Sequence, residues 1–145
     1  MRTFLTLAVP VMTAGAAHAG GIELTVEIPK LSVAEYHRPY VAIWIEDASG
    51  KVAANLSVWY DVDLKDSEGE KWLKDIRQWW RRTGRTLDMP MDGVSSPTKA
   101  PGVNKVTFPS DKGALAKLAP GEYKLVVEAT REVGGKEMVE IPFKW

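Results

Sequence analysis

Apolar and polar residues alternate along much of the chain, a pattern that predicts β-strands. Between Gly21 and Ile28 every second residue is apolar, which is typical of a strand with one buried face. The run from Tyr40 to Glu46 is apolar on both faces, so we expect it to be covered on both sides. Turn residues at 47–50 lead to a second run from Val52 to Tyr60, and the two runs are predicted to form a hairpin.

One segment has helical spacing instead. From Lys71 to Thr83 the apolar residues recur at intervals of three and four, which predicts an amphipathic helix with the apolar stripe Trp72, Leu73, Ile76, Trp79 and Trp80. Ser67 and Glu70 fit a capping box at its start, and Gly84 suits its C-terminal end. We expect the helix to cover a sheet face that carries two further tryptophans, Trp44 and Trp59.

Further strands are predicted after this helix. Arg85 to Pro109 is rich in Pro, Gly, Ser and Asp, and we expect it to be mostly irregular, with a strand at Val103 to Phe108. Residues alternate again from Tyr123 to Ala129, and Gly134-Gly135 signals a hairpin turn into a last strand with Val139, Ile141 and Phe143 on one face. The pattern as a whole predicts a mostly β protein, an antiparallel immunoglobulin-like β-sandwich with one amphipathic helix inserted.

The first 19 residues have the composition of a secretory signal peptide. Arg2 supplies the positive start, residues 4–12 are almost all apolar, and Ala17-His18-Ala19 has the small residues of a cleavage site. The apolar stretch is too short to cross ~30 Å of hydrocarbon as a helix. We therefore expect residues 1–19 to be removed, leaving residues 20–145 as a single periplasmic domain without a membrane span.

Composition narrows the classes of function. The 145 residues include 19 Lys and Arg against 19 Asp and Glu, and no Cys. Because formal charges cancel, the chain lacks the excess of positive charge that favours binding to nucleic acid. Without cysteine it has no disulfide framework, no thiolate nucleophile and no cysteine-ligated metal. These observations favour a soluble exported protein with no nucleic-acid partner.

Residues suited to catalysis or metal binding are few. His37 is the single histidine after the signal segment, so a histidine-rich metal site and an ordinary hydrolytic triad lack their parts. Five acidic residues between Asp61 and Glu70 lack the spacing of a calcium loop, and a solvated acidic loop is the favoured interpretation. Met89 and Met91 offer thioether ligands for copper(I) but have no nearby histidine. An enzyme therefore ranks below a carrier or a binding module.

The segment from Asp92 to Lys99 is rich in hydroxyl side chains and predicts a flexible loop that presents Thr98. Its order of residues resembles the motif at which FAD:protein FMN transferase joins FMN to a threonine through a phosphoester bond. The resemblance implies covalent FMN on Thr98, with the other motif positions matched by Asp92, Gly93, Ser95 and Ser96. Pro97 departs from the motif, which has Ala there; proline lacks an amide donor and favours an extended Ser96.

The chain after the signal also resembles a family of predicted periplasmic proteins, domain of unknown function 2271. The resembling stretches are 37–47, 71–73, 92–102 and 121–135. Members of this family look like companions of PepSY-type membrane proteins and flavin transferases, which implies a flavoprotein in extracytoplasmic electron transport. The alternative is a non-catalytic periplasmic binding or accessory module that docks a membrane or exported partner.

Overall fold

The computed structural model describes residues 6–8, 21–30, 32, 36–131 and 135–145. Its strands are β1 (Thr6–Ala8), β2 (Ile22–Ile28), β3 (Tyr40–Asp47), β4 (Val52–Tyr60), β5 (Ser95–Pro97), β6 (Gly102–Phe108), β7 (Glu122–Thr130) and β8 (Lys136–Lys144). They form a five-stranded sheet of order β5-β4-β3-β7-β8 and a three-stranded sheet of order β1-β2-β6. All neighbouring strands pair antiparallel except β4 and β5, which are parallel.

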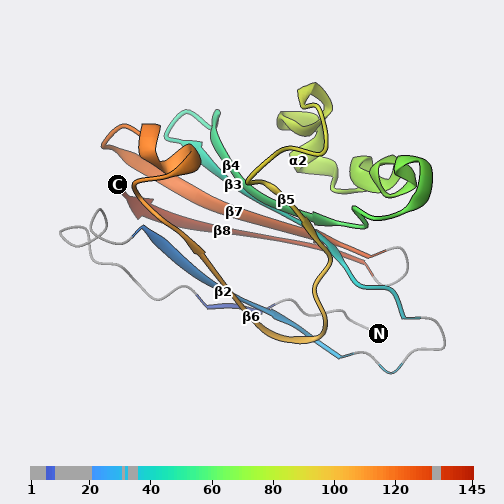
Figure 1. Ribbon diagram of the computed structural model, residues 1–145. Coiled ribbons are helices and arrows are strands. Elements are labelled where there is room, and N and C mark those ends of the chain that lie inside the picture. Colours follow the sequence, from blue (N-terminus) through green and yellow to red (C-terminus); the bar gives the residue numbers. More distant parts are fainter. Residues whose placement is uncertain (1–5, 9–20, 31, 33–35, 132–134) are drawn as a thin grey trace.

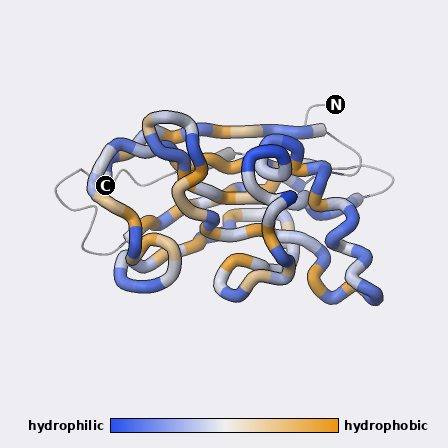
Figure 2. Tube along the Cα trace, turned by 90° about the horizontal axis from the view of Figure 1, so that it is seen from above, coloured by the Kyte–Doolittle hydropathy of each residue, from blue (hydrophilic) through white to orange (hydrophobic). Residues whose placement is uncertain are grey.

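The two sheets face each other, and a helical segment covers the outer face of the larger sheet (Figure 1). The prediction of a mostly β sandwich is confirmed. Seen from above, the side on which the helical segment lies, hydrophobic and hydrophilic residues are interspersed along the chain (Figure 2). Within the described residues no helix is long and apolar enough to cross a membrane.

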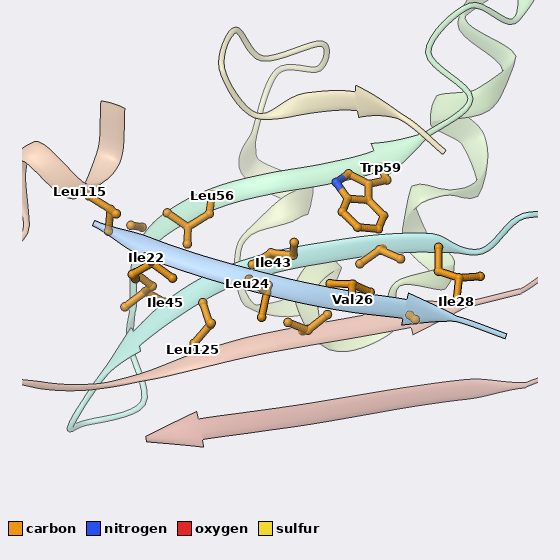
Figure 3. Packing of buried hydrophobic residues seen from close by; sticks show 14 of the residues in the cluster. Ile22, Leu24, Val26, Ile28, Ile43, Ile45, Leu56, Trp59, Leu115 and Leu125 are labelled. Atoms are coloured by element: carbon orange, nitrogen blue, oxygen red, sulfur yellow. The ribbon is translucent and has the colours of Figure 1, made fainter. Parts of the chain in front are cut away.

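The space between the sheets holds the larger apolar core (Figure 3). The alternation predicted for the first strand is confirmed, because its apolar side chains are all buried: Ile22, Leu24, Val26 and Ile28. They pack against Ile43 and Ile45 of β3 and Leu125 of β7, and Leu115 of the 3-10 helix η3 (Gly113–Lys117) belongs to the same cluster.

An irregularity in β4 changes which side chains face this core. The register between β3 and β4 skips Leu56, which is therefore an extra residue, a β-bulge. Because the bulge interrupts the alternation, Leu56 and Trp59 both face the sandwich core (Figure 3). Val58 and Tyr60 face the helical segment. Trp44 lies under the helical segment as predicted, but the prediction that Trp59 lies there is wrong for this reason.

The helical segment consists of shorter pieces than predicted. It comprises the 3-10 helix η1 (Lys65–Asp75), the α-helix α2 (Arg77–Arg82) and the 3-10 helix η2 (Gly84–Thr86). The prediction of one continuous helix over residues 71–83 is thus wrong. Ser67 has left-handed backbone angles (φ 54°, ψ 33°), and no side chain caps η1, so the predicted capping box is not formed.

The N-terminus of α2 is capped by the sheet instead. Glu128 of β7 is buried, and its two carboxylate oxygens accept the backbone N–H groups of Gln78 (3.0 Å) and Trp79 (2.8 Å). The first N–H groups of a helix lack intrahelical acceptors, and a negative charge is favourable at that end. This contact between distant residues ties the short helix to the centre of the sheet.

The apolar stripe of the segment is only partly buried. Ile76 and Trp79 are fully buried, as predicted, whereas Trp72 is 46% exposed and does not belong to the cluster under the helical segment. Gly84 is not the predicted left-handed helix end, since it is the first residue of η2. It makes room for Trp79, because a Cβ at Gly84 would lie 2.5 Å from a ring carbon of that indole.

Several predictions concern the ends and loops. The predicted strand in the irregular region is β6, but the same region also forms β5, which was not predicted. The β7–β8 hairpin is confirmed by its register; of the predicted turn, Gly134 lies outside the described residues. Residues 6–8 of the expected signal peptide form β1, which pairs with β2, and most of that segment also lies outside the described residues.

Candidate functional site

A cavity of about 310 Å³ lies at the end of the larger sheet where β4, β5 and β7 end and β3 begins. Its wall includes residues that directly follow three of these strands: Thr98 after β5, Asp61 after β4 and Arg131 after β7. Neighbouring strands are ~4.8 Å apart, and Thr98 and Arg131 stand three strand positions apart. The backbones at the two ends of the cavity are therefore separated by roughly 14 Å.

Two exposed apolar side chains line the cavity, one directly before η1 and one within it. Leu64 and Trp72 are each 46% exposed, and both contribute to the cavity wall. An exposed indole has a flat apolar face that water hydrates poorly, and such faces commonly stack on aromatic ligands. This combination is the feature of the cavity that suits a planar ring.

Arg131 forms the basic wall and is only 7% exposed. Its Nη1 donates to the carbonyl oxygen of His37 (2.8 Å) and its Nη2 to that of Pro29 (3.4 Å). The guanidinium carbon lies 5.3 Å from the centroid of the Tyr36 ring, a cation–π contact. The Nε atom of Arg131 and the hydroxyl of Tyr36 are buried, and neither has a hydrogen-bond partner among the residues that the structure describes.

Tyr40 supplies a fixed hydroxyl in the same wall. Its hydroxyl lies 3.0 Å from the carbonyl oxygen of Gly69 and 3.3 Å from Oδ2 of Asp61, so its proton is shared between two acceptors. Burial, together with the negative charge of Asp61, raises the pKa of Tyr40 from 10.0 to about 12. The hydroxyl therefore remains protonated and acts as a donor at neutral pH.

The expected acceptor loop is partly a strand. Ser95 and Ser96 belong to β5 at the edge of the sheet, where the Ser95 hydroxyl accepts the N–H of Met91 (2.9 Å). Lys99 Nζ donates to the Ser96 hydroxyl (3.2 Å). The loop is therefore more ordered than predicted, and Thr98 is half-buried rather than fully presented to solvent.

The structure separates the beginning of the motif from its end. Asp92 and Gly93 are exposed and line a different cavity of about 840 Å³, next to η3. Gly93 has a left-handed φ of 76°, a conformation that favours glycine. The five motif residues thus follow one edge of the larger sheet, and among them Thr98 alone lines the smaller cavity.

The other candidates from the sequence are not gathered into a site. His37 lines the smaller cavity, but the described residues contain no group of three or more His, Asp or Glu that is positioned to hold a metal ion. Asp61 accepts a hydrogen bond from Tyr40, and Glu68 lies 4.0 Å from Lys71 in an exposed ion pair. Met89 packs against the cluster under the helical segment.

The sequence does not predict that Arg131 and Tyr36 line this cavity or that Trp72 is exposed. Arg131 directly follows an alternating strand and belongs to no motif. The pairing of Tyr40 with Thr130 brings residues 36–38 beside Arg131, and this pairing is known only from the structure.

Residues 21–145 match the family model described as "Predicted periplasmic protein (DUF2271)". Neither the curated proteins nor the solved structures gave a match.

Proposed function

Because the chain belongs to the DUF2271 family of predicted periplasmic proteins, we propose that it is an exported carrier of covalent FMN in extracytoplasmic electron transfer. The signal segment is cleaved before Gly20, and an FAD:protein FMN transferase attaches the flavin to Thr98. A PepSY-type membrane protein is the proposed neighbour in electron transfer. The attached FMN supplies the redox chemistry, which is the reversible uptake of electrons by its ring.

The attachment step is a phosphoryl-type transfer. The Thr98 hydroxyl oxygen forms a bond to the phosphorus on the FMN side of FAD, the pyrophosphate P–O bond breaks, and AMP leaves. The hydroxyl proton is taken up by a base of the transferase. The product is a phosphoester between Thr98 and FMN, with no change in oxidation state.

The observation that carries this proposal is the position of Thr98 in a cavity that also exposes a tryptophan ring. Trp72 and Leu64 line the same cavity as Thr98, and their apolar surfaces would shield one face of a flavin ring attached there from water. A cavity of about 310 Å³ is at the small end of the range known for small-molecule sites. A cavity of this size would hold part of a flavin and would not enclose the whole of it.

Pro97 is compatible with this site. It is the last residue of β5, an edge strand, where a missing amide donor does not interrupt a sheet ladder. The extended conformation that proline favours for Ser96 is the conformation that β5 already has. Pro97 therefore removes one backbone N–H that the transferase could bind, but it does not distort the acceptor segment. Labelling is expected to be reduced rather than abolished.

The test is co-expression with an FAD:protein FMN transferase followed by peptide mass mapping. Wild type is expected to carry one FMN on the peptide with Thr98, Thr98→Ala to carry none, and Pro97→Ala to be labelled more completely. Thr86→Ala, which changes an exposed threonine outside the cavity, is the matched control and should be labelled like wild type. No label on wild type or Pro97→Ala would reject the carrier and leave the accessory module in its place.

A further inference from the structure

Arg131 is a buried cation for which the described residues provide no counter-ion. Within the described part of the chain it takes part in no ion pair, and its hydrogen bonds go to two neutral carbonyl groups. An arginine is seldom buried to this degree unless it is paired. Within the described residues its Nε–H has no acceptor. Arg131 also lines the cavity, and in that part of the chain its positive charge has no partner.

The position of Arg131 limits which part of a ligand attached at Thr98 could bind it. Arg131 follows β7 and Thr98 follows β5, three strand positions away, so their backbones are roughly 14 Å apart. A phosphate bonded to the Thr98 hydroxyl stays next to Thr98. A group that reaches Arg131 must therefore be the far end of the ligand, which in FMN is the ring, separated from the phosphate by the ribityl chain.

We propose that Arg131 binds the pyrimidine edge of the flavin ring, an inference that rests on the proposed function of Thr98. This edge carries a ring nitrogen and a carbonyl oxygen that accept hydrogen bonds, and it gains negative charge when the ring takes up two electrons and one proton. Trp72 and Leu64, which line the same cavity, would contact the flat face, and Arg131 would supply the charged donors at the edge. A positive charge at this edge favours the reduced ring and raises its midpoint potential.

Other charged groups in the cavity do not take this role. Asp61 and Asp75 also line it, and their negative charges disfavour an anion at their own side. Arg38 is exposed, so its charge is well solvated and contributes less to a ligand. Arg131 is the buried one of the two arginines in this wall, and its electrostatic effect is screened least.

Binding to unmodified protein tests this proposal without requiring attachment. Protein made in cells that lack the transferase is titrated with riboflavin, with FMN and with inorganic phosphate, and tryptophan fluorescence reports binding. Riboflavin has the ring without the phosphate, so it is expected to bind about as tightly as FMN, and phosphate is expected not to compete. Arg131→Gln should weaken riboflavin binding by about tenfold, through loss of a charge-assisted hydrogen bond, and Arg131→Lys should weaken it less.

The matched control is Arg85→Gln, which removes an exposed arginine outside the cavity and should leave riboflavin binding unchanged. FMN binding far tighter than riboflavin, or competition by phosphate, would overturn the proposal by making Arg131 a phosphate site. These arms use wild type, so they hold even if Arg131→Gln fails to fold. Equal riboflavin binding by a folded Arg131→Gln would overturn it as well.

A second readout uses flavinylated protein. Reduction with dithionite should give a lower midpoint potential for Arg131→Gln than for wild type or Arg85→Gln, and an unchanged potential would contradict the proposal. Covalent attachment at Thr98 and ring binding by Arg131 can fail independently, and the two failures can be distinguished. Riboflavin binding that depends on Arg131 without any label on Thr98 rejects only the covalent carrier, whereas a labelled Thr98 with no effect of Arg131 rejects only this inference.

Discussion

Replacing Glu128 with alanine should detach α2 from the sheet. The carboxylate accepts two backbone N–H groups, at 3.0 and 2.8 Å, and it is 4% exposed. A hydrogen bond to a charged group contributes about 1.5–3 kcal/mol, and each N–H left buried without an acceptor carries a similar penalty. With two bonds lost, Glu128→Ala should lower the free energy of unfolding by about 3–5 kcal/mol.

Glu128→Gln refines this prediction. The amide retains one acceptor oxygen but turns an NH₂ group toward the second backbone N–H, so the expected loss is about half as large. Urea unfolding followed by far-UV circular dichroism gives the free energies by linear extrapolation. The control is Glu68→Ala, which removes an exposed ion pair and should change stability by less than about 0.5 kcal/mol. If Glu128→Ala were no more destabilising than this control, the cap would not hold the helix.

Three further predictions concern the covered face of the sheet. Gly84→Ala should lower the free energy of urea unfolding by about 1–3 kcal/mol, because the new Cβ would lie 2.5 Å from a ring carbon of Trp79. At Gly121 the nearest atom would be 3.6 Å away, so Gly121→Ala should be tolerated. Equal effects of the two substitutions would contradict the close packing of Gly84 on Trp79. Tyr40 has a pKa of about 12 in the folded state against 10.0 when unperturbed, so the folded state binds the phenol proton more tightly. The stability that this difference contributes is complete below pH 10 and is lost between pH 10 and 12. Tyr40→Phe should lack this loss, and an alkaline decline identical to that of wild type would refute the prediction. Ile76→Ala removes a fully buried side chain and should lower the free energy of unfolding by about 2–5 kcal/mol. Trp72→Ala changes an exposed side chain and should leave the free energy of unfolding near that of wild type. Similar losses would show that both side chains belong to the core.

Alternation along the chain was sufficient to predict the long strands, because each buries one face or both in a regular ladder. It failed at Leu56, where a bulge moves Trp59 to the other side of the sheet. It also failed for the helix, because spacings of three and four are typical of an α-helix, whereas residues 65–75 form a 3-10 helix with three residues per turn. The cap of α2 comes from Glu128, about fifty residues away in sequence, so local capping signals gave the wrong start.

The candidate site was predicted in part. The motif identified Thr98, since a linear pattern is visible in the sequence. Arg131 and Tyr36 carry no such pattern, and they meet Thr98 in one cavity only because β7 and β5 end on the same side of the sheet. Trp72 was assigned to the core because its spacing matched the stripe, and the 3-10 geometry of η1 turns it toward the cavity instead.

The most direct test of the flavin carrier is the intact mass of the protein purified from the periplasm of cells that express the transferase. Wild type is expected to begin at Gly20 and to carry the added mass of one FMN, and Thr98→Ala is expected to have the same start and no added mass. A wild-type chain without FMN, or a Thr98→Ala chain that still carries it, would contradict covalent attachment at Thr98.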